Sequence, residues 1–168
     1  MNSVHNHKIS VLIFFVLFLF IPNEPVHAEN PKNYFRIGWE LQAEGKYSRS
    51  IPYLREYVKK NPFHEESAYF LALGLIFQEI LIDPALYRKD CLEAASILKK
   101  NIPLYEYELS GNLAPETSRR YFYMGLALWF AGRSDLAKSS FQDALKYDPS
   151  RKEGEYNIQM IEIELNQH

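Results

Sequence analysis

The sequence is poor in cysteine and carries little net charge, and each shortage excludes a class of protein. Cys91 is the single cysteine, so the chain folds without an internal disulfide. A lone cysteine of this kind is most often a small buried hydrophobic residue. The formal net charge of −2 argues against a nucleic-acid partner, which favours a basic face, and against an anionic membrane surface. The chain must therefore be held together by side-chain packing alone.

Residues suited to catalysis are also scarce. Three of the five histidines lie within the first 28 residues, and only His64 and His168 follow them. No HExxH, GxSxG or Cys–His arrangement is present, and no cluster has the spacing of a metal site. The acidic pair Glu65 and Glu66 falls at a predicted helix start, where carboxylates complement the helix dipole. We therefore expect a non-enzymatic protein that holds no metal and no cofactor.

The sequence has one long hydrophobic run, at its N-terminus. Residues 9–22 read ISVLIFFVLFLFIP and follow Lys8. A membrane-spanning helix needs about 20 apolar residues, so this run has the length of a signal-peptide core. Val26 and Ala28 are the small residues that precede a cleavage site, which predicts a signal peptide over residues 1–28. We expect an exported, periplasmic or secreted protein without a membrane span after cleavage; an uncleaved anchor is the alternative.

Residues 29–168 are expected to form one domain, and two of its segments share the spacing of their glycines and prolines. In each, a second glycine follows the first by seven residues, and a proline follows the first by 24 residues. The second glycine allows the left-handed conformation that ends a helix, and the proline stops the next helix. Each segment therefore predicts a helix, a tight turn and a second helix that Ser48 or Ser134 caps. The two sets are Gly38, Gly45 and Pro62, and Gly125, Gly132 and Pro149.

Small residues in the last segment indicate how its two helices pack. Ala137 and Ala144 allow a neighbouring helix to approach closely, and Gly125 leaves a hollow on that helix for the ring of Phe141. The pattern predicts the contact surface of two antiparallel helices. Its stripe on the second helix is formed by Leu136, Ala137, Ser140, Phe141, Ala144 and Leu145.

This pattern resembles that of tetratricopeptide repeats, in which a glycine on the first helix is followed by Gly, Ala, an aromatic residue, Ala and Pro. The segment 31–64 departs from the family at Ser50 and Tyr57, where alanine is preferred. The resemblance implies an all-α fold, a short α-solenoid of about three helix-turn-helix repeats with a C-terminal capping helix. The segment 118–151 matches through Tyr121, Gly125, Leu128, Gly132, Ala137, Phe141, Ala144 and Pro149. The segment 31–64 matches through Tyr34, Gly38, Leu41, Gly45, Tyr47, Leu54 and Pro62.

A middle repeat, about residues 67–103, is more divergent and is aligned through Gly74. It carries five more residues than the other two, which we place in the proline-containing connection LIDPALYRKD. Residues 104–117 are then expected to form a linker or extended loop. Residues 152–166 predict a lone capping helix with a polar outer face. Its packing face is formed by Ile158, Ile161 and Leu165.

Alignment of the three first helices on Gly38, Gly74 and Gly125 predicts a binding surface. One stripe on each helix is formed by the residues three positions before the glycine, one position after it and four positions after it. This stripe is separate from the stripe that packs on the second helix of the same hairpin. In the proteins that this repeat resembles, that stripe lines the concave side of the superhelix and holds a partner peptide. Here it is mainly apolar and aromatic, which suits hot-spot anchors. Its residues are Phe35, Trp39, Gln42, Leu71, Leu75, Gln78, Phe122, Leu126 and Trp129.

The predicted function is an interaction module or scaffold of the cell envelope that binds a protein or peptide partner in this groove. Residues 104–117 or the C-terminal helix could instead cover the groove, or it could mediate self-association. The same apolar cavity could carry a small molecule or lipid, and the domain could also bridge two components of an envelope complex. One variant of the family binds chaperone C-termini through a lysine and asparagine clamp, but here Phe35 and Trp39 occupy the early groove positions.

Overall fold

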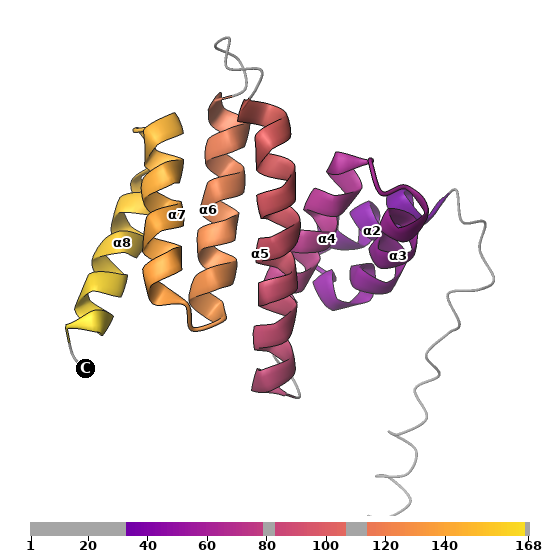
Figure 1. The fold of residues 1–168 in the computed structure, drawn as a ribbon. Helices are drawn as coiled ribbons and strands as arrows, with labels where there is room; N and C mark the ends of the chain where they lie inside the picture. The colour runs from indigo at the N-terminus through magenta and orange to yellow at the C-terminus, as the bar shows by residue number, and fades with distance from the viewer. Residues whose placement is uncertain (1–32, 79–82, 107–113, 167–168) are drawn as a thin grey trace, which may run out of the picture.

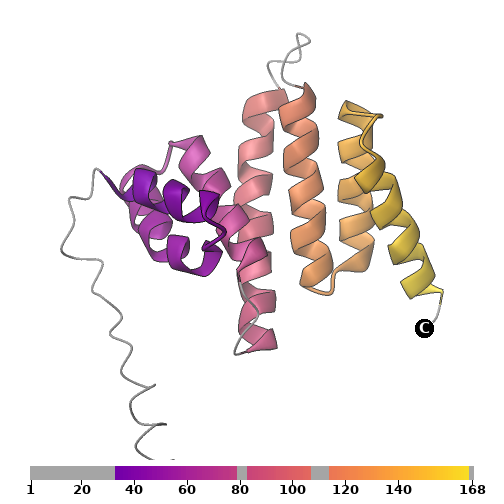
Figure 2. The same cartoon turned by 180° about the vertical axis from the view of Figure 1, so that it is seen from behind.

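The computed structural model describes residues 33–78, 83–106 and 114–166. Within these ranges the chain forms seven α-helices and no strand, which confirms the predicted all-α architecture (Figures 1 and 2). The predicted signal peptide lies outside the described residues. The helices are α2 (Tyr34–Ala43), α3 (Tyr47–Lys60), α4 (Glu65–Phe77), α5 (Pro84–Glu106), α6 (Ala114–Phe130), α7 (Ser134–Tyr147) and α8 (Lys152–Leu165).

The helices stack in chain order into a short array. Each helix packs against the next one along the chain, from α2 to α8. Helix α4 also contacts α2 and α6, so the first helices of successive hairpins are neighbours. In Figure 1 the array runs from the indigo α2 at one end to the yellow α8 at the other, with α6 between α5 and α7. This nearest-neighbour order is that of a helical solenoid.

The two end hairpins close through left-handed glycines, as their spacing predicts. Gly45 has a φ of 74° and Gly132 a φ of 72°. The amide of Arg133 then donates to the carbonyl of Leu128 at 2.8 Å, and the equivalent bond closes the first turn. This pair of features is the Schellman motif, which satisfies carbonyls that the helix end leaves unpaired.

The predicted serine N-caps are wrong. Helix α3 begins at Tyr47 and α7 at Ser134, which places Lys46 and Arg133 at the N-cap positions. Neither N-cap side chain forms a capping hydrogen bond. Because the glycine turn leads directly into the next helix, Ser48 and Ser134 already lie within its first turn.

The same two hairpins pack as their small residues predict. A Cβ atom added to Gly125 would lie 2.6 Å from Cε1 of Phe141, and one added to Gly38 would lie 2.5 Å from Cγ of Leu54. Real side chains do not come this close, so the second helix reaches its position only because these residues are glycines. Phe141 and the two alanines that flank it on α7 are fully buried. The predicted contact between the paired helices is therefore confirmed at both ends of the array.

The middle hairpin has a different register, and its alignment through Gly74 is wrong. A Cβ atom on Gly74 would lie 3.0 Å from Nε2 of Gln42 and 3.2 Å from Oγ of Ser50, so this glycine faces the preceding hairpin. Ala72 follows Gly38 by 34 residues, which is the period of the repeat, and it is fully buried. A small residue thus recurs at the repeat period, but it is an alanine.

The extra residues of the middle hairpin lengthen both α5 and the connection before it, which has six residues against three in each end hairpin. Helix α5 has 23 residues, whereas α3 and α7 have 14 each. Pro84 is its first residue, where a missing amide proton costs little. The carboxylate of Asp83 accepts a hydrogen bond from the amide of Ala85 at 2.8 Å and so helps to start the helix.

The predicted loop over residues 104–117 is helical at both of its ends. Helix α5 continues past Pro103 to Glu106, and α6 begins at Ala114. A proline removes one hydrogen bond of the helix but leaves the amides that follow able to complete a last turn. Residues 107–113 lie outside the described ranges.

Helix α8 caps the array, and its outer face is mixed, with exposed charged and apolar residues side by side. It packs on α7 through Ile161, which is fully buried, and through the partly buried Ile158, whereas Leu165 is exposed. Side chains spaced by four and three residues share a helical face, and one such set points away from α7. The exposed apolar residues of this set are Tyr156, Met160 and Ile163.

Candidate protein-interaction surfaces

Helix α2 presents a tryptophan at the surface beside a fixed aromatic cluster. Trp39 is 48 % exposed. Phe35, one turn earlier, is half-buried, and its ring centroid lies 5.5 Å from Tyr57, 5.0 Å from His64 and 6.0 Å from Phe70. These contacts come from α3, α4 and the turn between them, so the position of Phe35 is set by three elements of the fold.

The two glutamines of the predicted groove hold helices together. Nε2 of the buried Gln42 donates to Oγ of Ser50 at 3.0 Å and to the carbonyl of Phe70 at 2.7 Å. These bonds join α2 to α3 and α4. Nε2 of Gln78 donates to Oδ2 of Asp90 at 2.9 Å, which joins the end of α4 to α5. Both amide groups are therefore used within the fold.

The two predicted groove residues in the middle of α4 lie in the core. Leu71 is 3 % exposed and Leu75 is fully buried, and both belong to a cluster with Leu54 of α3 and Leu98 of α5. The register of the middle hairpin is the reason. Leu75 follows Leu41 by 34 residues, and Leu41 belongs to the stripe that faces the helical partner. In this arrangement neither leucine lines a surface groove.

The three predicted residues on α6 are half-buried toward the C-terminal end of the array. Phe122, Leu126 and Trp129 pack against the buried cluster around Phe141. Nε1 of Trp129 donates to Oε2 of Glu164 on α8 at 3.0 Å. The C-terminal helix therefore contacts this end of the predicted surface, where a partner would have to compete with it.

The nine predicted residues thus do not form one open groove. Most of them are used in contacts between neighbouring helices, and Trp39 is the member that the structure exposes. Partner binding at this surface stays a prediction. Its accessible part is the α2 end, at Trp39 and Phe35.

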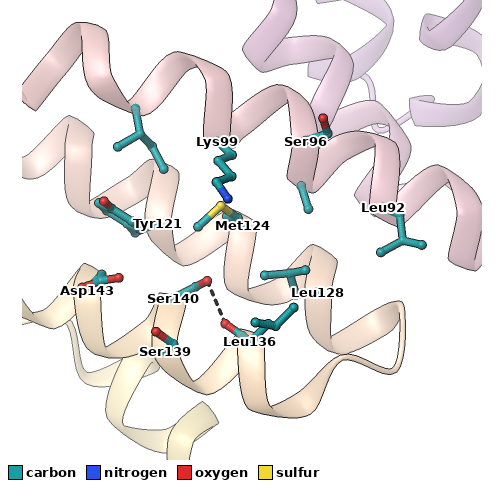
Figure 3. Close-up of a pocket in the computed structure, with 12 residues that line it drawn as sticks. Leu92, Ser96, Lys99, Tyr121, Met124, Leu128, Leu136, Ser139, Ser140 and Asp143 are labelled. Atoms are coloured by element: carbon teal, nitrogen blue, oxygen red, sulfur yellow. Dashed lines mark hydrogen bonds between the residues drawn. The ribbon is translucent and has the colours of Figure 1, made fainter.

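A second surface, which the sequence analysis missed, is a groove between α5 and α7 with α6 as its floor (Figure 3). Its volume is about 570 Å³. Leu92 on α5 and Leu136 on α7 line opposite walls and are 40 % and 58 % exposed. Met124 and Leu128 of α6 line the floor between them. The groove is therefore apolar along its base and at both rims.

Polar side chains reach this groove from both walls. Lys99 reaches the groove from α5, and Asp143 from α7 (Figure 3). Within the described part of the chain, neither charge forms an ion pair. The hydroxyls of Ser96 on α5 and Ser139 on α7 likewise form no hydrogen bond with described residues.

The sequence contained a weak signal for this groove. Leu136 is predicted to lie in the buried stripe of the last hairpin with Ala137 and Phe141, but it stands at the edge of that stripe and is exposed. Leu92 is a second leucine on an outer face. Their placement opposite each other depends on how α5 and α7 flank α6, which no local pattern shows.

Cys91 and Tyr87 of α5 are titratable groups that lie outside these surfaces. Cys91 is fully buried, and burial raises the pKa of its thiol to about 11, which confirms the predicted buried residue. The phenol of Tyr87 donates to the carbonyl of Ile76 at 2.8 Å, and burial raises its pKa as well. Among the described residues, no group of three or more His, Cys, Asp and Glu could hold a metal. In the same ranges, no helix has both the length and the apolar character to cross a membrane.

Comparison with known proteins identifies the repeat. The tetratricopeptide repeat model matches residues 31–64 and 118–151. No curated protein sequence matches the chain. Among solved structures, the MamA RS-1 ArsTM double mutant resembles 83 % of this chain over 67 % of its own, with 19 % identity and a TM-score of 0.62. The NMR structure of the first TPR domain of human RPAP3 resembles 82 % of this chain over 93 % of its own, with 17 % identity and a TM-score of 0.54.

At such low identities these likenesses concern the fold alone. They agree with the described helices, and the chain folds as a helical solenoid with tetratricopeptide repeats in its two end hairpins. The predicted repeat type is therefore confirmed. The middle hairpin, formed by α4 and α5, lies outside both matched ranges, in keeping with its different register.

Proposed function

We propose that this chain, with a tetratricopeptide repeat at each end, is a non-catalytic interaction module of the cell envelope that binds a partner segment at Trp39. Domains of this repeat typically bind other proteins, which supports the general class. The envelope location is supported by the signal-peptide pattern of residues 1–28. The observation that carries the binding surface is the exposed indole on the first helix of the array.

Trp39 is suited to anchor a partner. Tryptophan is among the residues most enriched at binding hot spots, and burial of a large apolar side chain stabilises a complex by about 1.5–3 kcal/mol before association costs. Phe35 beside it is already held by three rings, so little ordering is required when a partner binds.

Photocrosslinking in the native envelope tests this surface. A photoreactive residue at position 43, which is exposed and one turn after Trp39, is expected to capture a partner, and Trp39→Ala in the same chain is expected to weaken that capture about tenfold. Tyr156 provides the matched control, because it is an exposed aromatic residue at the other end of the array, 61 % exposed. A photoreactive residue at position 156 should not capture the same partner, and Tyr156→Ala should leave capture unchanged.

Two results would change the proposal. If Trp39→Ala remains folded by circular dichroism and captures its partner as well as before, this surface is not the site. If the captured molecule is a second copy of the chain, the surface mediates self-association.

Export is tested separately from binding. Mass analysis of the protein from the periplasmic or secreted fraction should give a chain that begins at Glu29, because cleavage is expected after Ala28. A chain that retains residues 1–28 and stays with the membrane fraction would support the uncleaved anchor instead.

A further inference from the structure

We propose that the groove between α5 and α7 is a second binding site, which takes an extended segment of a partner protein. The segment would carry two apolar side chains, with an acidic and a basic residue next to each other at one end. This site lies on different helices from Trp39 and does not rest on the function proposed for that residue.

The apolar lining gives the groove its affinity. Leu92 and Leu136 stand at the two rims, and Met124 and Leu128 lie on the floor between them (Figure 3). Exposed apolar groups that gather in a concave site mark a place where a partner removes surface from water. Two small apolar side chains from one segment, pointing toward the floor, would cover all four residues.

The length of the groove matches a short peptide segment. Its lining runs from Leu92 to Ile102 on α5, which is about 15 Å at the rise of an α-helix. On α7 it runs from Leu136 to Asp143, about 10 Å. An extended chain rises about 3.3 Å per residue, so about three to five residues fit between the two ends.

The groove offers a partner one positive and one negative charge. Lys99 on one wall and Asp143 on the other have no ionic partner among the described residues. Both lie toward the Tyr121 end of the groove, because α5 and α7 run parallel and each charge follows the rim leucine of its own helix by seven residues (Figures 1 and 3). A carboxylate beside Lys99 and a cation beside Asp143 would complete both pairs, which places the charged end of the segment there. A lipid tail would leave both charges unpaired, so the groove favours a peptide of mixed charge.

The two serines favour an extended backbone. An extended segment has unpaired amide and carbonyl groups, whereas a helix satisfies its own and a hydrocarbon tail has none. Ser96 and Ser139 offer hydroxyls from the two walls, and each can both donate and accept a hydrogen bond. These hydroxyls would pair with the backbone of the segment.

Defined peptides and a methyl NMR titration of the full chain, expressed for export, test the site. The probes are the acetylated and amidated pentapeptides LSLEK and LSLKE, the neutral peptide LSLQQ, and palmitate. We expect one charged peptide to shift the methyl signals of Met124 and Leu136. The neutral peptide should bind about tenfold more weakly, because both ion pairs are lost.

Charge reversal then tests which wall of the groove binds which charge of the peptide. Lys99→Glu should weaken the preferred peptide about tenfold, and the double variant Lys99→Glu with Asp143→Lys should prefer the peptide of opposite order. The matched control is Lys100→Glu, which reverses an exposed charge of α5 that does not line the groove.

Loss of the apolar rim has its own control. Leu136→Ser should abolish the shift of Met124, whereas Leu86→Ser should not, because Leu86 is an exposed leucine of α5 outside the groove. Thermal melting shows that each variant is folded before it is titrated.

Three results would overturn the proposal. The first is that neither charged peptide shifts the groove methyls at millimolar concentration. The second is that LSLQQ binds as well as the charged peptides, since the charges would then specify nothing. The third is that palmitate shifts these methyls and the peptides do not, which would identify the groove as a site for small amphiphiles.

Discussion

The end hairpins and the middle hairpin of this array achieve close helix packing in different ways. At the ends, Gly38 and Gly125 receive Leu54 and Phe141 from the second helix of the same hairpin. In the middle, an alanine stands at the corresponding period, and the conspicuous glycine faces the preceding hairpin instead. A small side chain at the point of closest approach is therefore the physical requirement, and glycine is one way to meet it.

The difference also affects the surface of the molecule. Helix α5 has nine residues more than α3 or α7, since it has 23 residues and they have 14. The groove lies where this longer helix and the regular last hairpin meet across α6 (Figures 1 and 3). The middle hairpin, whose sequence departs most from the repeat, therefore supplies one wall of the groove.

The largest expected effect is the loss of the ring that fills an end hairpin. Phe141→Ala should lower the free energy of unfolding by about 3–5 kcal/mol, because it leaves a cavity opposite Gly125. Urea denaturation followed by circular dichroism measures this. The control Leu136→Ala, at an exposed position of the same helix, should change stability by less than about 0.5 kcal/mol. Similar effects for both variants would show that α7 does not pack as described.

The next effect separates the two kinds of glycine. Gly125→Ala should destabilise by about 1–2 kcal/mol, because overpacking against Phe141 exceeds the gain in helix propensity. Gly74→Ala meets Gln42 and Ser50 at 3.0 and 3.2 Å and should change stability by less than about 1 kcal/mol. The same urea titrations compare the two. If Gly74→Ala lowered the free energy of unfolding more than Gly125→Ala, the tighter helix contact would lie at Gly74 and not at Gly125.

The end hairpins could be predicted because their signals are steric and local. A left-handed turn favours glycine at positions 45 and 132, and a contact as close as that of Gly125 with Phe141 excludes any side chain. Because only glycine meets these two requirements well, glycines recur at fixed spacing in the sequence. The middle hairpin lacks these signals. Alanine is too common a residue for Ala72 to reveal its role, and Gly74 is a glycine that faces the preceding hairpin instead of its own second helix.

The candidate surfaces were harder to predict because exposure depends on neighbours. Leu75 lies in the core and Trp129 meets α8, although both belong to the stripe that includes Trp39. A helical stripe shows which residues share a face but not what covers that face. The groove at Leu92 and Leu136 depends on three helices at once and has no local pattern at all.

A smaller effect distinguishes the middle hairpin at alkaline pH. Burial raises the pKa of Cys91 from 9.0 to about 11, so the thiol loses its proton at a higher pH in the folded state than in the unfolded state. This contribution to stability is complete below about pH 9 and is lost as the pH rises toward about 11. Between pH 8 and pH 10 the loss should be about 1 kcal/mol.

Urea titrations at the two pH values measure this loss. In Cys91→Ala the contribution of the thiol should be absent, and the pH dependence that remains should come from the phenols of Tyr69 and Tyr87, whose pKa values burial raises in the same direction. An unchanged dependence on pH in Cys91→Ala would mean that the thiol does not contribute.

The smallest expected effect concerns the charges that join the first and middle hairpins. Nη2 of Arg55 on α3 lies 2.7 Å from Oε2 of Glu93 and 3.5 Å from Oδ1 of Asp90 on α5, but the arginine side chain is 45 % exposed. A double-mutant cycle with Arg55→Ala and Glu93→Ala should give a coupling energy of about 0.2–1 kcal/mol that falls in high salt. A coupling well above this range would mean that charge rather than the packing of Leu54 and Leu98 holds the two hairpins together. A small coupling would instead agree with the end hairpins, where the paired helices meet mainly through buried contacts such as that of Phe141 with Gly125.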